Sequence, residues 1–333
     1  MVQMGGVVQT SIRFSSIGLV LLIAAGCASA PKQTDGVEYY IQGIQAERAG
    51  NPDRATGLFE QAVAVNPNLR MAHIRLGDAY RAKGDYARAA THYQAATELD
   101  PYALYNHYNL GLAYQLLNRF QEAAKAYLAA LELNPADVKS NMNLGVVYLA
   151  LGETGSAVAF LERATKLDPT YSAAWSNLGV ALDASGDLTK AEATYRKALE
   201  LDSNNPATLQ NLAQNLISQK KAPEAITIME QVLPRDSSPG VRRRYAEALA
   251  LDKKYDAALA QLDLALKVDP NNVPSLNTKA DILIQRYVES LELENRARLS
   301  ALEAWKTSLR IQPNQPKIAE QVRKWENPNA LSR

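Results

Sequence analysis

Cysteine and histidine are scarce in this chain, which has one cysteine and three histidines among 333 residues. One cysteine cannot form a disulfide within the chain, and this set is too small for the Cys/His clusters that hold structural zinc. Net charge is nearly absent as well, because 36 Lys and Arg balance 35 Asp and Glu. A chain without excess charge has no general attraction to nucleic acid or to an acidic membrane surface. The composition therefore predicts no nucleic-acid partner.

Sequence motifs for catalysis are also absent. The chain has no phosphate-cradling glycine loop, no nucleophile elbow and no HExxH zinc motif. It is rich instead in apolar residues, which make up 47% of the sequence and suffice for a continuous core. The sequence predicts a protein that is not an enzyme, with no catalytic residue, no metal, no cofactor and no small-molecule substrate.

The N-terminal segment combines little charge with a short apolar run. Arg13 is the only charged residue among the first 31, and the uncharged run from Phe14 to Ala25 follows it. This run is shorter than the roughly 20 residues that a transmembrane helix needs. It is typical of a signal peptide, which takes no part in the fold.

The run ends in Ile23-Ala24-Ala25-Gly26-Cys27, which resembles the lipobox of bacterial lipoproteins, with Ala24 where Leu is commonest. The resemblance implies that residues 1–26 are a signal peptide. Cys27 would then carry acyl chains such as palmitate, and residues 27–36 would form a polar tether. Several acyl chains give stable anchoring. Ala28 stands where the inner-membrane retention signal has Asp, so for a Gram-negative source the resemblance implies the outer membrane, facing the periplasm. The alternative is an ordinary secretory signal cleaved near 28–30.

From Gly36 onward the sequence repeats. Pro67, Pro101, Pro135 and Pro169 are each 34 residues apart. If each proline is position 32, the repeats begin at Gly36, Arg70, Leu104, Val138, Ser172, Pro206, Pro239 and Val273. Position 8 is Gly or Ala in every repeat, and position 24 is large in the first seven. The apolar positions 4, 7, 8 and 11, then 20, 24 and 27, follow helical spacing, so each repeat predicts two amphipathic helices.

This pattern resembles the tetratricopeptide repeat. The resemblance implies an all-α, right-handed superhelix (an α-solenoid) of about eight helix-turn-helix repeats over residues 37–313. Pro270 and Pro313 are 43 residues apart, so the last repeat carries an insertion, which its helical pattern predicts to lengthen the helices. Residues 314–333 predict a capping helix and tail, because a solenoid needs a polar outer face at its end.

Two of the histidines occupy position 4 of neighbouring repeats, at His73 and His107. Equivalent positions of stacked helices lie ~8–10 Å apart, which is too far for both to bind one metal ion directly. Repeat five has Trp175 at this position. We therefore interpret both histidines as packing residues.

In tetratricopeptide superhelices the first helix of each pair lines a concave groove, with positions 2, 5, 6, 9, 12 and 13 facing the ligand. Here position 6 is Asn in repeats three to six, and position 9 is apolar in repeats three to five. Asn amides can pair with a peptide backbone, and an exposed apolar patch points to a partner. The candidate partner-binding residues are Tyr105, Tyr108, Asn109, Leu112, Leu116, Met142, Asn143, Val146, Leu149, Asn177, Val180 and Asn211. The alternatives are that Asn is merely common at position 6 and that adjacent helices cover the apolar residues.

Together these features predict a non-catalytic, lipid-anchored scaffold of the bacterial cell envelope that binds a peptide or helix of another envelope protein in its groove. Similar repeat lipoproteins include the pilotins of type IV pilus secretins and outer-membrane adaptors for periplasmic proteases or peptidoglycan hydrolases, and the sequence does not choose between them. The alternative is an accessory subunit of an exopolysaccharide or cell-wall assembly complex.

Overall fold

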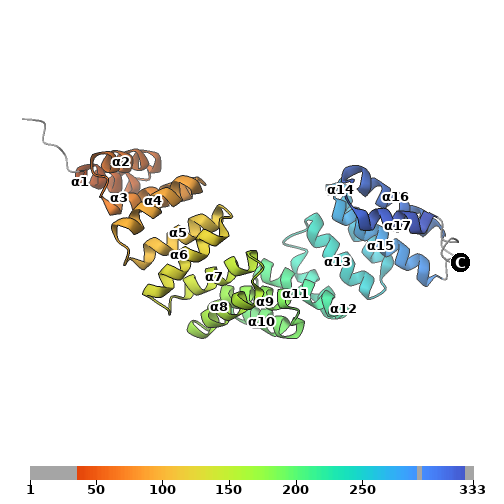
Figure 1. Cartoon of the computed structure of the whole chain (residues 1–333). Coiled ribbons are helices and arrows are strands. Elements are labelled where there is room, and N and C mark those ends of the chain that lie inside the picture. The colour runs from red at the N-terminus through yellow and green to blue at the C-terminus, as the bar shows by residue number, and fades with distance from the viewer. Residues whose placement is uncertain (1–35, 291–294, 327–333) are drawn as a thin grey trace, which may run out of the picture.

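The computed structural model describes residues 36–290 and 295–326, and the regular structure in these residues is entirely helical. Figure 1 shows helix pairs following one another along an open arc, with the two ends of the chain far apart. The expected signal peptide, Cys27 and residues 27–35 of the tether lie outside the described residues. In the described part no helix combines the length and the apolar character needed to cross a membrane.

The described residues form seventeen helices, which are eight consecutive pairs and one final helix. The pairs are α1 (Val37–Arg48) with α2 (Pro52–Val65), α3 (Arg70–Ala82) with α4 (Tyr86–Leu99), α5 (Leu104–Leu116) with α6 (Phe120–Leu133), α7 (Val138–Ala150) with α8 (Thr154–Leu167), α9 (Ser172–Ser185) with α10 (Leu188–Leu201), α11 (Pro206–Ser218) with α12 (Ala222–Val232), α13 (Pro239–Leu251) with α14 (Tyr255–Val268) and α15 (Val273–Glu289) with α16 (Asn295–Ile311), followed by α17 (Pro316–Glu326). The predicted α-solenoid of about eight pairs with a capping helix is confirmed.

Small residues at position 8 set the distance between the two helices of a pair. A Cβ atom on Gly179 would lie 2.5 Å from a ring carbon of Tyr195, and Tyr195 is buried. Position 8 therefore has no room for a side chain where an aromatic ring occupies position 24. In repeat seven, position 24 is the aliphatic Leu262 and position 8 is Ala246. The pairing of small and large residues in the sequence thus has a direct steric cause.

Position 4 connects each pair to the one before it. In four successive first helices, a nitrogen of the side chain at position 4 lies within hydrogen-bond distance of a proline carbonyl six residues earlier. These bonds are His73 Nε2 to Pro67 O at 3.0 Å, His107 Nε2 to Pro101 O at 2.8 Å, Asn141 Nδ2 to Pro135 O at 3.1 Å and Trp175 Nε1 to Pro169 O at 2.9 Å. Because a carbonyl only accepts, each side chain donates. Interpreting His73 and His107 as packing residues therefore missed their role as donors at the connections.

The pairs stack so that first helices lie on the inside of the arc. Each second helix packs against the first helix of the next pair, and α5, α7, α9 and α11 also contact one another in succession. Within the described residues, no second helix has comparable contact with the second helix of the next pair. Helices on the inner side of a curved stack lie closer together than those on the outer side. The first helices therefore form the concave face of the arc in Figure 1.

The C-terminal end differs from the regular repeats. Helices α15 and α16 each have 17 residues, whereas the earlier helices have 11 to 14. Helix α17 buries Val322 and Trp325 against this last pair, and the Trp325 ring meets Tyr287 edge-on at a centroid distance of 6.0 Å. Its opposite face carries exposed Lys317 and Glu320. Helix α17 thus covers the apolar end of the stack and presents charge to solvent.

Candidate partner-binding face

The twelve candidate residues lie on four successive first helices, α5, α7, α9 and α11, which share the concave face. Tyr105 is 50% exposed and Leu116 is 40% exposed. Asn109 and Asn143 are buried. The other eight are partly exposed, and these are Tyr108, Leu112, Met142, Val146, Leu149, Asn177, Val180 and Asn211. The structure therefore brings all twelve onto one side of the stack but places two of them below its surface.

The apolar candidates both pack and remain accessible. Met142, Leu149 and Val180 pack against the buried core that runs through the middle of the stack, and each keeps part of its surface open. Leu112 and Val146 are likewise partly exposed. We call Tyr105, Tyr108, Leu112, Val146 and Val180 the inner strip. It crosses three helix pairs, so it is continuous along the concave face.

The four asparagines at position 6 fall into two groups. Asn143 donates from Nδ2 to the Tyr108 hydroxyl at 3.2 Å, so the side chains of α5 and α7 are joined. Asn109 is 3% exposed, and its Nδ2 has no hydrogen-bond partner among the described residues. Asn177 and Asn211 are partly exposed, and their side chains form no hydrogen bond within the described part of the chain. Only the second group can pair with a ligand without rearrangement.

The tyrosines of the strip are held in place by polar contacts. The Tyr105 hydroxyl lies 3.4 Å from Asp78 Oδ1, and the same oxygen accepts a 2.7 Å hydrogen bond from Tyr93. Burial raises the pKa of the Tyr108 phenol above its usual value, so that hydroxyl stays neutral. Since it accepts from Asn143, its own hydrogen is available for a ligand. Asp78 was not predicted as a site residue, because its partner Tyr93 lies on the other helix of the pair.

Charge is sparse around the inner strip. Among the ligand-facing positions of α5, α7 and α9, only Lys139 and Asp183 are charged. Asp183 accepts hydrogen bonds from the Tyr195 hydroxyl at 2.9 Å and from Asn215 Nδ2 at 2.5 Å, so its carboxylate is already engaged. Lys139 is exposed and forms no ion pair within the described residues, so the middle of the concave face offers apolar surface, hydroxyls and amides together with one free ammonium group.

The two histidines of repeat two, His73 and His92, are hydrogen-bonded to each other. His92 donates from Nδ1 to His73 Nδ1 at 3.1 Å, because the other nitrogen of His73 is the donor to Pro67. Burial, and then the neighbouring His73, lower the pKa of His92 to about 4. Over residues 36–290 and 295–326, no group of three or more His, Cys, Asp or Glu side chains is placed to hold a metal ion. No sequence motif indicated the contact between these two rings.

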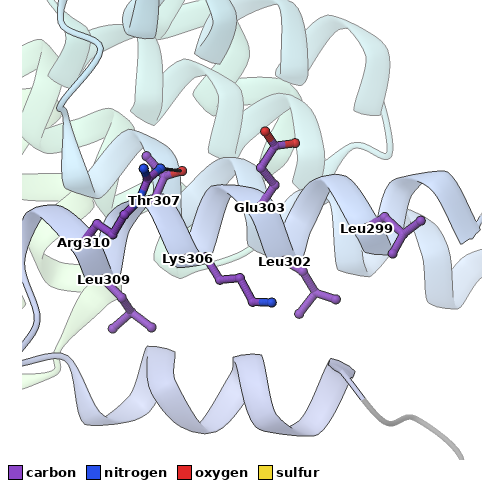
Figure 2. Close-up of a pocket in the computed structure, with 7 residues that line it drawn as sticks. All are labelled: Leu299, Leu302, Glu303, Lys306, Thr307, Leu309 and Arg310. Atoms are coloured by element: carbon purple, nitrogen blue, oxygen red, sulfur yellow. Dashed lines mark hydrogen bonds between the residues drawn. The ribbon is translucent and has the colours of Figure 1, made fainter.

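A second surface lies at the C-terminal end, on the side of α16 (Figure 2). It is an open hollow of about 720 Å³ lined by Leu299, Leu302, Glu303, Lys306, Thr307, Leu309 and Arg310. Lys306 pairs with Glu326 of α17 at 2.6 Å and Arg310 donates to the Thr307 hydroxyl, whereas Glu303 is exposed and has no side-chain partner among the described residues. All seven lining residues come from one helix. The hollow is therefore an apolar helix face with no converging reactive groups.

Comparison with protein families gives a match over most of the stack. A family model described as tetratricopeptide repeat matches residues 42–103, 108–172, 157–206 and 211–273. A second model with the same description matches residues 182–239. These matches include eleven of the twelve candidate residues, and Tyr105 lies between the first two matched segments.

Solved structures with the same architecture include a tetratricopeptide repeat protein from Parabacteroides merdae, with a TM-score of 0.60 and 19% identity over 78% of this chain and 99% of that one. PilF of Pseudomonas aeruginosa gives a TM-score of 0.56 and 20% identity over 64% of this chain and 97% of that one. PilW, described as a widely conserved type IV pilus biogenesis factor, gives 0.53 and 20% identity over 60% and 93%. The search of curated proteins found no match. Identities this low establish the fold alone.

Proposed function

The chain belongs to the tetratricopeptide repeat family, and we propose that it is a lipid-anchored scaffold of the bacterial cell envelope that binds a segment of another envelope protein on its concave face. Proteins of this family are typically non-catalytic and bind other proteins. The proposal combines that general role with two features of this chain, which are the inner strip and the lipobox-like sequence at Cys27.

The inner strip is the observation that carries the binding proposal. Leu112, Val146 and Val180 occupy position 9 of three successive first helices and stay partly exposed on the inside of the arc. The parts of these apolar side chains that remain open to water contribute nothing to folding there, and a continuous line of them points to a partner. Their burial by a partner contributes about 25 cal/mol for each Å² of apolar surface removed from water. A partner segment lying across α5, α7 and α9 would cover all three.

Two observations support the envelope location. Residues 14–27 combine an uncharged run with a cysteine at its end, the pattern that directs lipid attachment in bacteria. The chain also shares its fold with PilF and with the type IV pilus biogenesis factor PilW. We therefore propose attachment to the outer membrane through Cys27, with pilus or secretin assembly, or adaptation of a protease or hydrolase, as the process served.

The binding proposal is tested by the double variant Leu112→Asp with Val146→Asp. Two carboxylates placed in the strip lose their hydration when a partner docks, so we expect crosslinking of the partner in native membranes to be abolished. The matched control is Leu128→Asp with Leu167→Asp, which changes two exposed leucines on the outer helices α6 and α8 of the same repeats. Circular dichroism should show the same helicity for both. Crosslinking that survives in the strip variant would remove the proposal.

The anchoring proposal is tested separately with Cys27→Ser. We expect the wild-type chain to incorporate an alkyne-labelled palmitate and to fractionate with membranes, because several acyl chains on one residue give stable attachment. The serine variant should lose the label and leave the membrane fraction. A chain that incorporates no label, or that is cleaved between residues 28 and 31 instead, would show an ordinary secretory signal.

A further inference from the structure

We propose that the partner segment carries a basic side chain, lysine or arginine, that binds Asp281 of α15 at the C-terminal end of the concave face. The inference rests on the proposed function, because it names the chemistry of the partner at that face. Three observations support it, namely the change of character along position 9, the free charge of Asp281 and the acceptors beside it.

The row of residues at position 9 changes from apolar to acidic along the stack. From repeat three to repeat eight, this row consists of Leu112, Val146, Val180, Gln214, Glu247 and Asp281. Helices α9, α11, α13 and α15 contact one another in succession, so the row continues along the concave face beyond the inner strip. A segment that covers the inner strip and follows the row therefore meets the carboxylates of the last two pairs.

Asp281 is the one charged residue of α15 that has no ion pair within the described part of the chain. The other three are paired, Lys279 with Asp263 at 2.6 Å, Arg286 with Asp256 at 2.6 Å and Glu289 with Lys253 at 3.5 Å. On the neighbouring helix α13, Glu247 pairs with Arg243. The negative charge of Asp281 is therefore left without a counter-ion.

The surroundings of Asp281 fit a residue on the floor of a concave surface. Asp281 is exposed to solvent, yet protein atoms around its carboxyl exclude part of the water that would stabilise the charge. This burial raises the pKa of the Asp281 carboxyl above its usual value, the Trp305 indole lowers it, and the charge of Glu247 raises it again. A cation bound at Asp281 would stabilise the carboxylate and lower this pKa.

Asn277 adds an acceptor one helical turn before Asp281, at another ligand-facing position. Asn277 Nδ2 donates to Gln315 Oε1 at 2.8 Å. The Gln315 amide is fixed in this orientation, because its Nε2 donates to the carbonyls of Ser308 and Gln312 at 3.2 and 2.8 Å. Only Asn277 Oδ1 is left, just below the surface and without a donor among the described residues. Carboxylate and amide oxygens both accept, so the group that fits beside them is a cationic donor.

Lys139 places the basic side chain at this end of the face and not over the inner strip. It is exposed on α7 and forms no ion pair in the part of the chain that the structure describes. A second cation close to Lys139 would be repelled, whereas Asp281 attracts one. The concave face therefore orders its partner, with apolar residues on α5, α7 and α9 and a basic residue on α15.

The test is fluorescence anisotropy with the full chain in detergent and three labelled peptides of equal length. All three share one apolar part made of Leu, Val and Ala, and they end in lysines, glutamines or glutamates. We expect the lysine peptide to bind about tenfold more tightly than the glutamine peptide, with a Kd that rises with salt, and the glutamate peptide to bind most weakly. Equal Kd values for the three peptides, or no binding of the lysine peptide, would overturn the inference.

Charge variants tie this preference to Asp281. Asp281→Asn should make the Kd values of the lysine and glutamine peptides equal, and Asp281→Lys should make the glutamate peptide bind best. Both variants should keep their helicity in circular dichroism, because Asp281 is exposed and has no ion pair to lose among the described residues.

The matched control is Asp256→Asn on the outer helix α14, which removes the same charge beside α15 and should keep the preference for lysine. A preference for lysine that survives Asp281→Asn would contradict the inference. If Leu112→Asp with Val146→Asp loses its crosslinked partner but the peptides show no preference, this inference fails while the proposed function stands.

Discussion

The steric pairing of positions 8 and 24 leads to a prediction about one methyl group. In Gly179→Ala the new Cβ would lie 2.5, 2.6 and 2.8 Å from three ring carbons of Tyr195. That ring cannot move away easily, because Tyr195 is 1% exposed and its hydroxyl bonds Asp183 at 2.9 Å. Overpacking typically costs ~1–3 kcal/mol, and the better helix propensity of Ala returns roughly 1 kcal/mol. We expect a net destabilisation of up to about 2 kcal/mol.

Two further glycines serve as controls for the same substitution. Gly57 lies inside α2, and a Cβ there would meet nothing within 4 Å, so Gly57→Ala should stabilise the chain by about 0.5–1 kcal/mol. A Cβ atom on Gly145 would lie 2.5 Å from Leu161 Cγ and 3.1 Å from the carbonyl oxygen of Ala157, so Gly145→Ala should also destabilise the chain, by up to about 2 kcal/mol. We therefore expect Gly57→Ala to be more stable than the wild-type chain, and Gly145→Ala and Gly179→Ala to be less stable than it.

The assay is urea unfolding followed by circular dichroism, with hydrogen exchange to locate the change in α9 and α10. Unfolding of a repeat array can depart from two-state behaviour, so midpoints are compared together with local exchange. Tyr195→Leu in the Gly179→Ala background should recover part of the loss, because it recreates the Ala246–Leu262 pair. The reasoning is refuted if Gly179→Ala stabilises the chain as much as Gly57→Ala does.

Three other predictions follow from polar side chains that make hydrogen bonds within the stack. Burial lowers the pKa of the His92 imidazole to about 4. The free energy of unfolding should therefore fall by about 1–2 kcal/mol as the pH drops from 6.5 towards 4, a value that allows for the partial exposure of His92. In urea unfolding, His92→Gln should reduce this dependence of the unfolding free energy on pH. Trp175→Phe removes the donor to Pro169 and should lower thermal stability by ~0.5–1.5 kcal/mol, with no change in peptide binding. Burial alone would raise the pKa of the Glu192 carboxyl group, but hydrogen bonds, of which the one from Lys221 is the largest, lower this pKa overall. The stability that the carboxylate contributes above pH 4.5 should therefore be lost as the pH falls further. Glu192→Gln should remove that loss.

Much of the fold could be predicted because each structural rule is local to one repeat. The pairing of Gly at position 8 with a large residue at position 24 joins residues 16 apart in sequence, and it appears in every pair from Gly43 with Phe59 to Gly179 with Tyr195. Repetition makes such a rule visible in one sequence. The helix boundaries and the stacking order follow from it.

The candidate site was less predictable because its properties depend on contacts between repeats. Asn143 is covered because Tyr108, 35 residues earlier, reaches its amide, whereas Asn177 has the same sequence position and stays open. The pattern at position 6 therefore predicted the location of the amides but not which of them face the ligand. The hollow on α16 was missed for a similar reason, since it exists only where the regular stack ends.

Contact between neighbours alone has a mechanical consequence. Over residues 36–290 and 295–326, each helix pair has substantial contact only with the pairs beside it, so a force applied to the two ends of this part passes through every interface in turn. Small changes in tilt at each interface add along the array. The chain should therefore stretch and bend as a spring before any helix unwinds, and it should lengthen in steps of one pair when pulled further.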